Sequence, residues 1–96
     1  MTAADALEQH REEIRAVVQA HRAANPRVFG SALRGEGTDT SDLDLLVDRL
    51  PGMTLFDLAR AMLELEQRLG VPVDVVTPLD LPESFRARVL AEAVPV

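Results

Sequence analysis

Apolar residues recur with helical spacing over residues 3–24, while charged residues occupy the opposite side of the same segment. This pattern predicts an amphipathic helix. Proline disfavours helical geometry in the residue before it, so the Asn25-Pro26 pair is expected to end this helix. The positions on the inner face of the predicted helix are Leu7, Ile14, Val17, Val18 and His21.

Three short apolar runs predict strands. The first covers residues 27–29 and stops at Gly30-Ser31, and the glycine- and threonine-rich segment 33–41 that follows predicts a loop. The second covers residues 42–47, where alternation places Leu43, Leu45 and Val47 on one face and Asp42, Asp44 and Leu46 on the other. The third covers residues 71–76.

Two further helices are expected between and after these strands. Residues 55–69 carry one, with Thr54 as N-cap, Asp57 in the first turn and Gly70 as C-cap. Its predicted inner stripe is Leu55, Leu58, Ala59, Met62, Leu65 and Leu69. The last helix is expected to begin near Asp80 or Leu81, with Glu83 completing a capping box. Its predicted apolar face is Phe85, Val89, Leu90 and Val94.

The order α-β-β-α-β-α predicts an α/β (α+β) fold with a small mixed sheet of three or more strands and helices packed on it. A chain of 96 residues favours one domain over residues 1–96. No apolar stretch approaches the roughly 20 residues that span a bilayer, and the beginning of the chain is polar. The chain has no cysteine, which fits the cytoplasm. We therefore expect a cytoplasmic protein without a membrane segment.

The net charge of the chain limits the classes of binding partner that we expect. The net charge is −6, and all ten basic residues are arginines. The basic footprint of a nucleic-acid-binding protein is absent from this composition, so we expect no direct nucleic-acid contact. A nucleotide carrying a divalent cation remains compatible with an acidic protein, because the cation neutralises the phosphates.

Asp42 and Asp44 stand two residues apart in a predicted strand. Residues at positions i and i+2 project from the same face, with Cα atoms about 6.6–7 Å apart, so the two carboxylates can converge on one ion. Magnesium is usually bound by one or two carboxylates together with phosphate oxygens. Taken alone, such a pair is more often a turn residue followed by an exposed charge on an edge strand.

Three other features favour a site over that simpler interpretation. Gly30-Ser31 directly follows a predicted strand, and ten residues separate Ser31 from Asp42. Asp74 lies among valines in the third predicted strand, where an unpaired carboxylate would cost several kcal/mol. Ser31 suits phosphate binding better than nucleophilic attack, because no histidine stands at a recognisable spacing to activate it. Two interpretations of Arg34 stay open: a residue that contacts a phosphate, and a solvated residue of the loop.

These motifs closely resemble the DNA polymerase β-like nucleotidyltransferase superfamily, and within it the minimal nucleotidyltransferase (MNT) proteins. The resemblance covers most of the chain and rests on Gly30-Ser31, the spacer with Arg34-Gly35, the run Ser41-Asp42-Leu43-Asp44-Leu45 and the run Val73-Asp74-Val75. It implies the nucleotidyltransferase fold. It also implies that Gly30 and Ser31 bind the triphosphate of ATP and that Asp42, Asp44 and Asp74 form a carboxylate triad that holds two Mg²⁺ ions. In this resemblance Asp74 also positions or deprotonates the acceptor hydroxyl.

The same resemblance implies a partner and a reaction. MNT proteins of this size resemble antitoxins paired with a helical HEPN ribonuclease toxin, and the implied reaction transfers AMP to a tyrosine of that toxin. A hetero-oligomer would follow from such a pairing. Two alternatives stay open: an antitoxin that neutralises its partner by binding alone, through faces such as that of Phe85, Val89 and Val94, and an adenylyltransferase of small molecules. His10 and His21 are explained by the amphipathic helix and are left out of the site.

Overall fold

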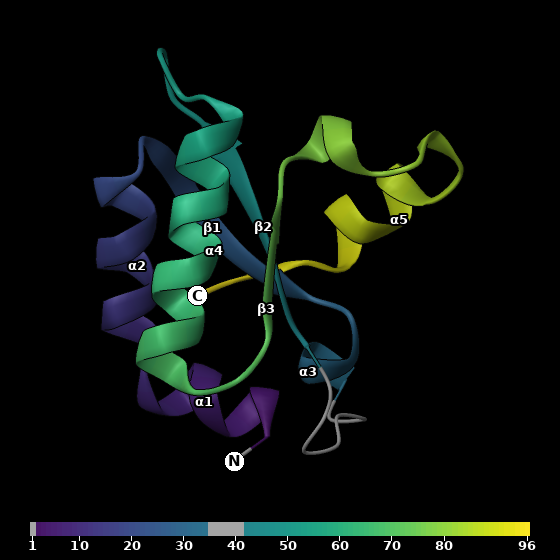
Figure 1. Ribbon diagram of the computed structural model, residues 1–96. Coiled ribbons are helices and arrows are strands. Elements are labelled where there is room, and N and C mark those ends of the chain that lie inside the picture. The colour runs from purple at the N-terminus through teal and green to yellow at the C-terminus, as the bar shows by residue number, and fades with distance from the viewer. Residues whose placement is uncertain (1, 35–41) are drawn as a thin grey trace.

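Four strands form one mixed sheet, with helices on both of its faces (Figure 1). The computed structural model describes residues 2–34 and 42–96. The elements in chain order are α1 (Ala3–Gln9), α2 (Arg11–Ala20), β1 (Ala23–Phe29), α3 (Ser31–Arg34), β2 (Leu43–Arg49), α4 (Leu55–Leu69), β3 (Val73–Val76), the 3-10 turn η1 (Pro78–Asp80), α5 (Glu83–Glu92) and β4 (Val94–Pro95). The predicted α/β class with a mixed sheet is confirmed. The predicted order lacked α3, η1 and β4.

The strand order is β3-β2-β1-β4. β1 pairs with β2 and with β4 in antiparallel fashion, whereas β2 and β3 are parallel. Helix α2 packs on β1 and α4 packs on β3, and both lie on the same side of the sheet (Figure 1). On the other side η1 contacts β2. Among the described residues, no helix is long and apolar enough to cross a membrane.

The alternation predicted for the second strand is present in β2. Leu43, Leu45 and Val47 are all fully buried in the main hydrophobic cluster, together with residues of α2 and α4 such as Ile14 and Leu65. Leu46 is also fully buried, but outside this cluster, as expected for a side chain that points to the opposite face. The sheet is therefore apolar on both faces at its centre.

The single helix predicted over residues 3–24 is wrong in two respects. The helix is interrupted at His10, whose backbone (φ −128°, ψ 26°) separates α1 from α2, and α2 already ends at Ala20. The interruption changes the helix direction, so that α1 lies against β2 and α3 while α2 lies against β1 and α4. Each half thereby buries its own apolar side chains.

Asn25 and Pro26 lie inside a strand and do not end a helix. β1 begins at Ala23, and its pairing with β2 shifts register between Ala24 and Arg27. Asn25 has φ +52°, and asparagine is one of the few residues that tolerates this geometry. Proline is accepted at such bulges because no ladder hydrogen bond is required of it there.

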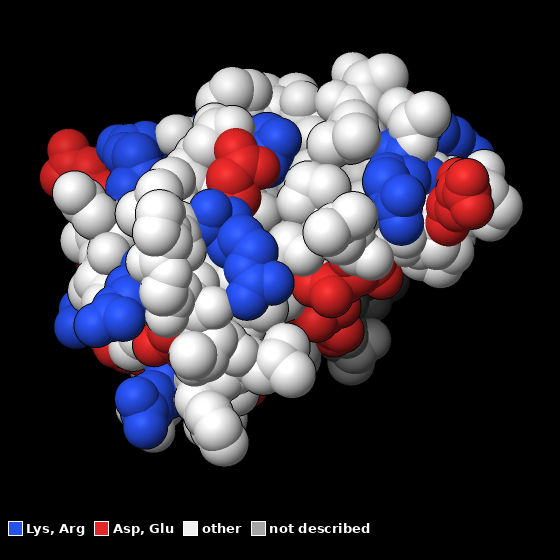
Figure 2. All heavy atoms as spheres, turned by 90° about the horizontal axis from the view of Figure 1, so that it is seen from above, with Lys and Arg blue, Asp and Glu red and all other residues white. Residues whose placement is uncertain are grey.

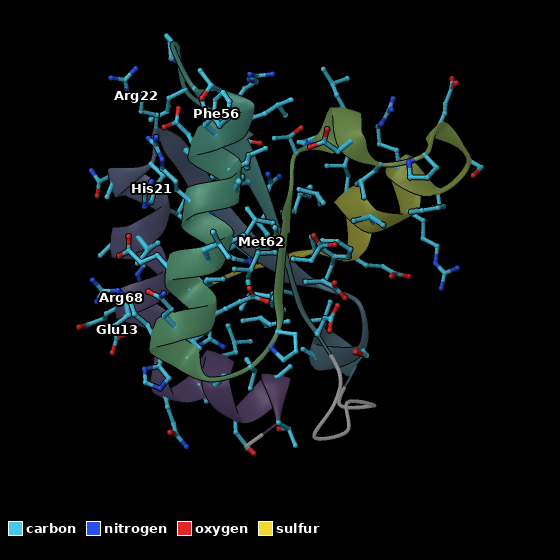
Figure 3. The ribbon with its side chains drawn as sticks, in the orientation of Figure 1. Glu13, His21, Arg22, Phe56, Met62 and Arg68 are labelled. Atoms are coloured by element: carbon cyan, nitrogen blue, oxygen red, sulfur yellow. The ribbon has the colours of Figure 1, made fainter. Side chains whose placement is uncertain are left out.

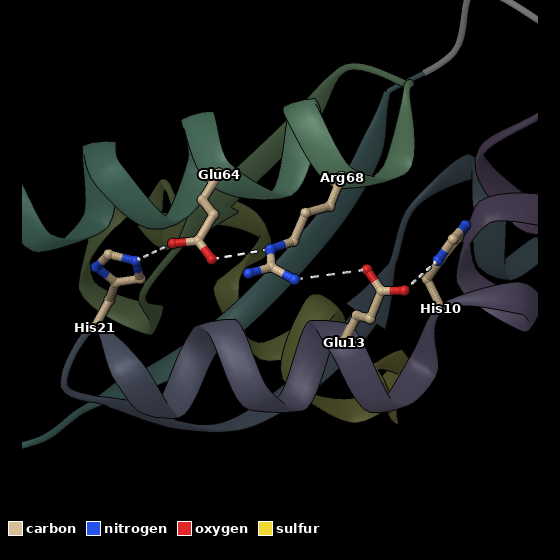
Figure 4. Close-up of polar contacts among 5 residues, drawn as sticks. All are labelled: His10, Glu13, His21, Glu64 and Arg68. Carbon is tan, nitrogen blue, oxygen red and sulfur yellow. Dashed lines mark hydrogen bonds and ion pairs between the residues drawn. The ribbon is translucent and has the colours of Figure 1, made fainter.

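A chain of polar contacts ties α2 to α4 (Figure 4). His21 at the end of α2 lies 2.9 Å from an oxygen of Glu64, whose other oxygen accepts from Arg68 at 2.9 Å. Arg68 lies 4.0 Å from Glu13, and Glu13 lies 3.0 Å from His10. The hydrogen bond with His21 lowers the pKa of Glu64. Both histidines thus have structural partners on the helical layer.

Helix α4 has the predicted caps but a rotated inner stripe. Thr54 and Asp57 form a capping box, and Gly70 ends the helix with φ +74°. The inward-facing positions are Leu58, Ala61, Met62, Leu65 and Leu69. Leu55 and Ala59 are exposed, as is Phe56 at the start of the helix, whereas Met62 points toward the sheet (Figure 3). The predicted stripe was therefore wrong at Leu55 and Ala59.

Replacing Thr54 by alanine is expected to lower the free energy of unfolding by about 1 kcal/mol, because the Thr54 hydroxyl accepts from the backbone N–H of Asp57. For a domain of this size the melting temperature should fall by roughly 4–8 °C, measured by circular dichroism. Ser84→Ala, which removes an exposed hydroxyl within α5, is the control and should change little. Equal melting temperatures for Thr54→Ala and wild type would contradict the role of the cap.

The C-terminal segment departs most from the prediction. Helix α5 begins at Glu83, not at Asp80 or Leu81, because Asp80 instead accepts from the backbone N–H of Thr77 and caps η1. None of the residues of α5 is fully buried, so its predicted apolar face does not enter the core. After α5 the chain returns to the sheet as β4, and the Val96 N–H donates to the Pro26 carbonyl at 3.0 Å.

Candidate active site

One row of side chains crosses three strands on the sheet face opposite the main core. Phe29 at the end of β1 is paired with Asp44 of β2, and Asp44 is in turn paired with Asp74 of β3. Directly paired residues project to the same face, and adjacent strands lie about 4.8 Å apart. The register therefore brings together two of the three predicted acids, although they are 30 positions apart in sequence.

Asp42 stands at the entrance to this row. It is exposed and precedes β2, which begins at Leu43, so its predicted place inside the strand is wrong. The Leu43 N–H donates to the Pro72 carbonyl at 2.8 Å, which fixes the first residue of β2 to the segment before β3. Asp42 is thereby held next to the start of the strand that carries Asp44.

The three carboxylates share one electrostatic environment. Burial, and after it the negative charges of Asp74 and Asp42, together raise the pKa of Asp44 to about 6. The surroundings of Asp44 thus disfavour its charged form. A cation placed among these groups would remove the mutual repulsion.

Gly30 forms the wall of the site beside Asp44. Its φ of +76° is left-handed, and a Cβ added at this position would lie 2.5 Å from Oδ2 of Asp44. Only glycine therefore permits both the turn and the close approach of the carboxylate. Ser31 follows as the first residue of α3 and is half-buried. The predicted glycine-serine turn lies beside the predicted acids.

Part of the predicted site lies outside the described residues. The backbone of Arg34 ends α3, but its side chain is not among those described, and Gly35 and Ser41 belong to the segment 35–41, which is not described. Within residues 2–34 and 42–96, no set of three or more acidic, histidine or cysteine side chains is already arranged to hold a metal ion.

The donor chemistry nevertheless fits a divalent cation of the magnesium type. Asp42 and Asp44 supply hard carboxylate oxygens from positions two residues apart, and the raised pKa of Asp44 reflects a group that gains from a nearby positive charge. Magnesium commonly takes only one or two protein carboxylates and completes its octahedron with water and substrate phosphates. A preformed cage of three acids is not required for this mode of binding.

A cavity that the sequence did not reveal opens beside Gly30. Its volume is about 300 Å³, and it lies between the end of β1 and α5. The residues that line it are Phe29, Gly30, Phe85, Arg88, Val89 and Glu92. The spacing of Phe85 and Val89 indicated one face of a helix, but the sequence did not indicate that this face stays open instead of entering the core.

Paired carboxylates and a tight glycine turn on one sheet face define a site suited to phosphate-bearing ligands and divalent cations. Residues 7–96 match the nucleotidyltransferase domain, and the chain belongs to this family. The protein is accordingly an enzyme of the nucleotidyltransferase class.

Relatives of similar length share this assignment. A Methanocaldococcus jannaschii protein, provisionally named a protein adenylyltransferase, is 37% identical over 94% of this chain and 97% of its own. Protein adenylyltransferase MntA of Thermococcus cleftensis is 34% identical over 86% of this chain and 92% of its own. These two names describe the relatives, and they indicate adenylyl transfer to proteins within the family.

Solved structures agree on the fold. A structure provisionally described as a minimal nucleotidyltransferase has a TM-score of 0.86 and 45% identity, over 97% of this chain and 95% of that one. A structure described as a toxin-antitoxin with AMP-PNP has a TM-score of 0.74 at 17% identity, over 88% of this chain and 69% of that one. At that identity the second structure supports the fold alone.

Proposed function

We propose that the protein is a magnesium-dependent adenylyltransferase that transfers AMP from ATP to a tyrosine of a HEPN-family ribonuclease toxin, and so acts as an antitoxin. The observation that carries the catalytic part is the register that pairs Asp44 with Asp74, with Gly30 against Asp44. The names of the relatives support adenylyl transfer to a protein. The HEPN partner and the hetero-oligomer rest on the resemblance of the motifs to MNT antitoxins.

The three acids would have different roles according to their positions on the sheet. Asp42 and Asp44 would hold the divalent cations, two in this proposal, and Asp74 would face the acceptor from the neighbouring strand. The cations would neutralise the phosphates and stabilise the attacking and leaving oxygens of the displacement. Gly30, Ser31 and Arg34 would bind the triphosphate.

In the proposed reaction, Asp74 accepts the proton of the acceptor hydroxyl. The freed oxygen attacks the α-phosphorus of ATP in line with the leaving group. The new bond joins the acceptor oxygen to AMP, and the bond to the β-phosphate breaks, releasing pyrophosphate. Asp74 suits this role because it is exposed on an edge strand, where an acceptor can reach it.

Charge supports a protein acceptor over a nucleic acid. The net charge is −6. On the face seen in Figure 2, arginines are scattered among acidic and uncharged atoms and form no continuous stripe. A polyanionic acceptor would meet no extended basic surface on this face. A tyrosine hydroxyl on a folded partner requires no extended basic surface for its recognition.

A second candidate is neutralisation by binding alone. It is favoured by α5, where Phe85 and Leu90 are just over 40% exposed, and by Val94, which is 44% exposed. Exposed apolar side chains on one segment are typical of a contact surface. In that case the three acids would not be needed for the effect on the partner.

Replacing Asp74 by asparagine separates the two candidates. We expect transfer from ATP labelled at the α-phosphate to the partner to fall roughly 10²–10⁴-fold, the usual contribution of a general base, while binding of ATP with magnesium is retained. Glu83→Gln, an exposed acid at the start of α5, is the matched control and should transfer normally.

Three outcomes would contradict the proposal. If the partner is silenced equally by wild type and Asp74→Asn and never gains the mass of an AMP group, neutralisation by binding alone is correct. If label appears on a small molecule and never on a protein, the acceptor class is wrong. If ATP is not bound by the wild-type protein, the nucleotidyl donor itself is wrong.

A further inference from the structure

The cavity beside Gly30 is separate from the acids but continuous with the turn that adjoins them. It has about 300 Å³ and is bounded by Phe29 and Gly30 on the sheet side and by one face of α5 on the other. This volume is at the lower end of the range for small-molecule sites, so it suits part of a ligand whose remainder lies outside the cavity.

The lining combines flat apolar surfaces with a polar rim. Phe29, Phe85 and Val89 supply the apolar walls. At the rim, Nε of Arg88 donates to a carboxylate oxygen of Glu92 at 3.2 Å, which places a charged pair at the mouth of the cavity. Aromatic and aliphatic walls with a small number of polar groups favour a planar heterocyclic ligand.

The side chains of α5 that line the cavity are not part of the hydrophobic core. None of the ten residues of this helix is fully buried, and Phe85 keeps 42% of its surface exposed. Keeping an aromatic side chain in contact with water forgoes the stabilisation that its burial would provide. A ligand that covers Phe85 would recover part of that stabilisation.

The position of the cavity indicates which of the two substrates it binds, the donor or the acceptor. Phe29 lies on one side of Asp44 in the row, and Asp74 lies on the other. In an in-line displacement the acceptor and the leaving pyrophosphate are on opposite sides of the phosphorus. Since Asp74 and the open sheet edge take the acceptor, the leaving pyrophosphate of the donor lies on the side of Phe29 and Gly30. The cavity that Gly30 also lines therefore adjoins the donor and not the acceptor.

We propose that this cavity binds the nucleobase of the donor nucleotide, with Phe85 and Val89 against the base plane and the Arg88–Glu92 pair at the edge of the base. The inference rests on the proposed function, because it takes the triphosphate to lie at Gly30 and Ser31. It assigns Phe85 to donor affinity and not to contact with the protein acceptor.

The test compares a donor with a base and a probe without one. Binding of ATP with magnesium and of inorganic tripolyphosphate with magnesium is measured by calorimetry for wild type, Phe85→Ala and Leu90→Ala. Base stacking on an aromatic side chain predicts about a tenfold loss of ATP affinity in Phe85→Ala, with tripolyphosphate affinity unchanged. Leu90 is equally exposed on α5 but does not line the cavity, so Leu90→Ala should bind both as wild type does.

The outcomes distinguish this inference from the proposed function. If wild type binds neither probe, the proposed function fails. If wild type binds ATP and Phe85→Ala binds it equally well, the nucleobase assignment fails while the proposed function stands. A third result, unchanged ATP affinity with a raised KM for the protein acceptor, would assign the cavity to the acceptor and overturn the inference. Val89→Ser repeats the comparison if Phe85→Ala does not fold.

Discussion

Replacing Gly30 by alanine is expected to reduce nucleotidyl transfer by about 10²-fold or more while the protein stays folded. The left-handed backbone at φ +76° costs an alanine about 1–2 kcal/mol. The larger effect is local, because the new Cβ would lie 2.5 Å from Oδ2 of Asp44. Asp44 must then rotate away, and the carboxylate leaves the position that it shares with Asp42 and Asp74.

Gly70 offers a matched control for this experiment. It ends α4 with φ +74°, nearly the same as Gly30, but an added Cβ would meet no atom within 4 Å. Gly70→Ala should therefore show the same backbone cost in a thermal melt and retain full transfer to the partner. If the two variants lose transfer equally, or if both keep it, the close approach of Gly30 to Asp44 has no part in the activity.

The elements that could be predicted from sequence are those whose signals are local. Thr54 and Gly70 act on the ends of their own helix, and both were identified correctly because capping depends on residues within one turn. The alternation of Leu43, Leu45 and Val47 likewise lies within one strand. Such features require no knowledge of what the element packs against.

The elements that could not be predicted depend on distant partners. β4 has only two residues, and it is a strand because it pairs with Arg27 and Val28 far earlier in the chain. The Asn25-Pro26 bulge is accommodated by pairing of β1 with β2 on either side of it. Residue type alone predicted a helix end there, since the pairing that overrides this preference is not encoded locally.

The site was predictable as a set of residues but not as an arrangement. Spacing placed Asp42 and Asp44 on one face, yet only the parallel register of β2 and β3 brings Asp74 beside Asp44. The contact between Gly30 and Asp44 depends equally on the end of β1 lying against β2. The cavity at Phe85 depends on how α5 lies relative to the end of β1, and no local pattern encodes that arrangement.

Removing the charge of Asp44 is expected to stabilise the protein and abolish its activity. The pKa of Asp44 is raised from 3.8 to about 6, so the folded state binds a proton that the unfolded chain has lost. The free energy of unfolding therefore falls as pH rises from about 4 to 6, and the penalty is complete at neutral pH. Asp44→Asn carries no such charge, so its free energy of unfolding should be about 1–2 kcal/mol higher than that of wild type once solvent screening is allowed for.

A control variant at Asp48, on the same strand, should change the stability of the protein in the opposite direction. Asp48 has a lowered pKa, chiefly because Asn25 donates to it and also because Arg27 does, so Asp48→Asn should lower the melting temperature at neutral pH and retain transfer. Asp44→Asn should instead raise the melting temperature by roughly 4–16 °C without metal, with transfer lost and no further gain on adding magnesium. A lower melting temperature for Asp44→Asn, or transfer at the wild-type rate, would show that Asp44 is an ordinary structural carboxylate. The opposite signs at two aspartates four residues apart would follow from their neighbours, two further carboxylates for Asp44 and an asparagine with an arginine for Asp48.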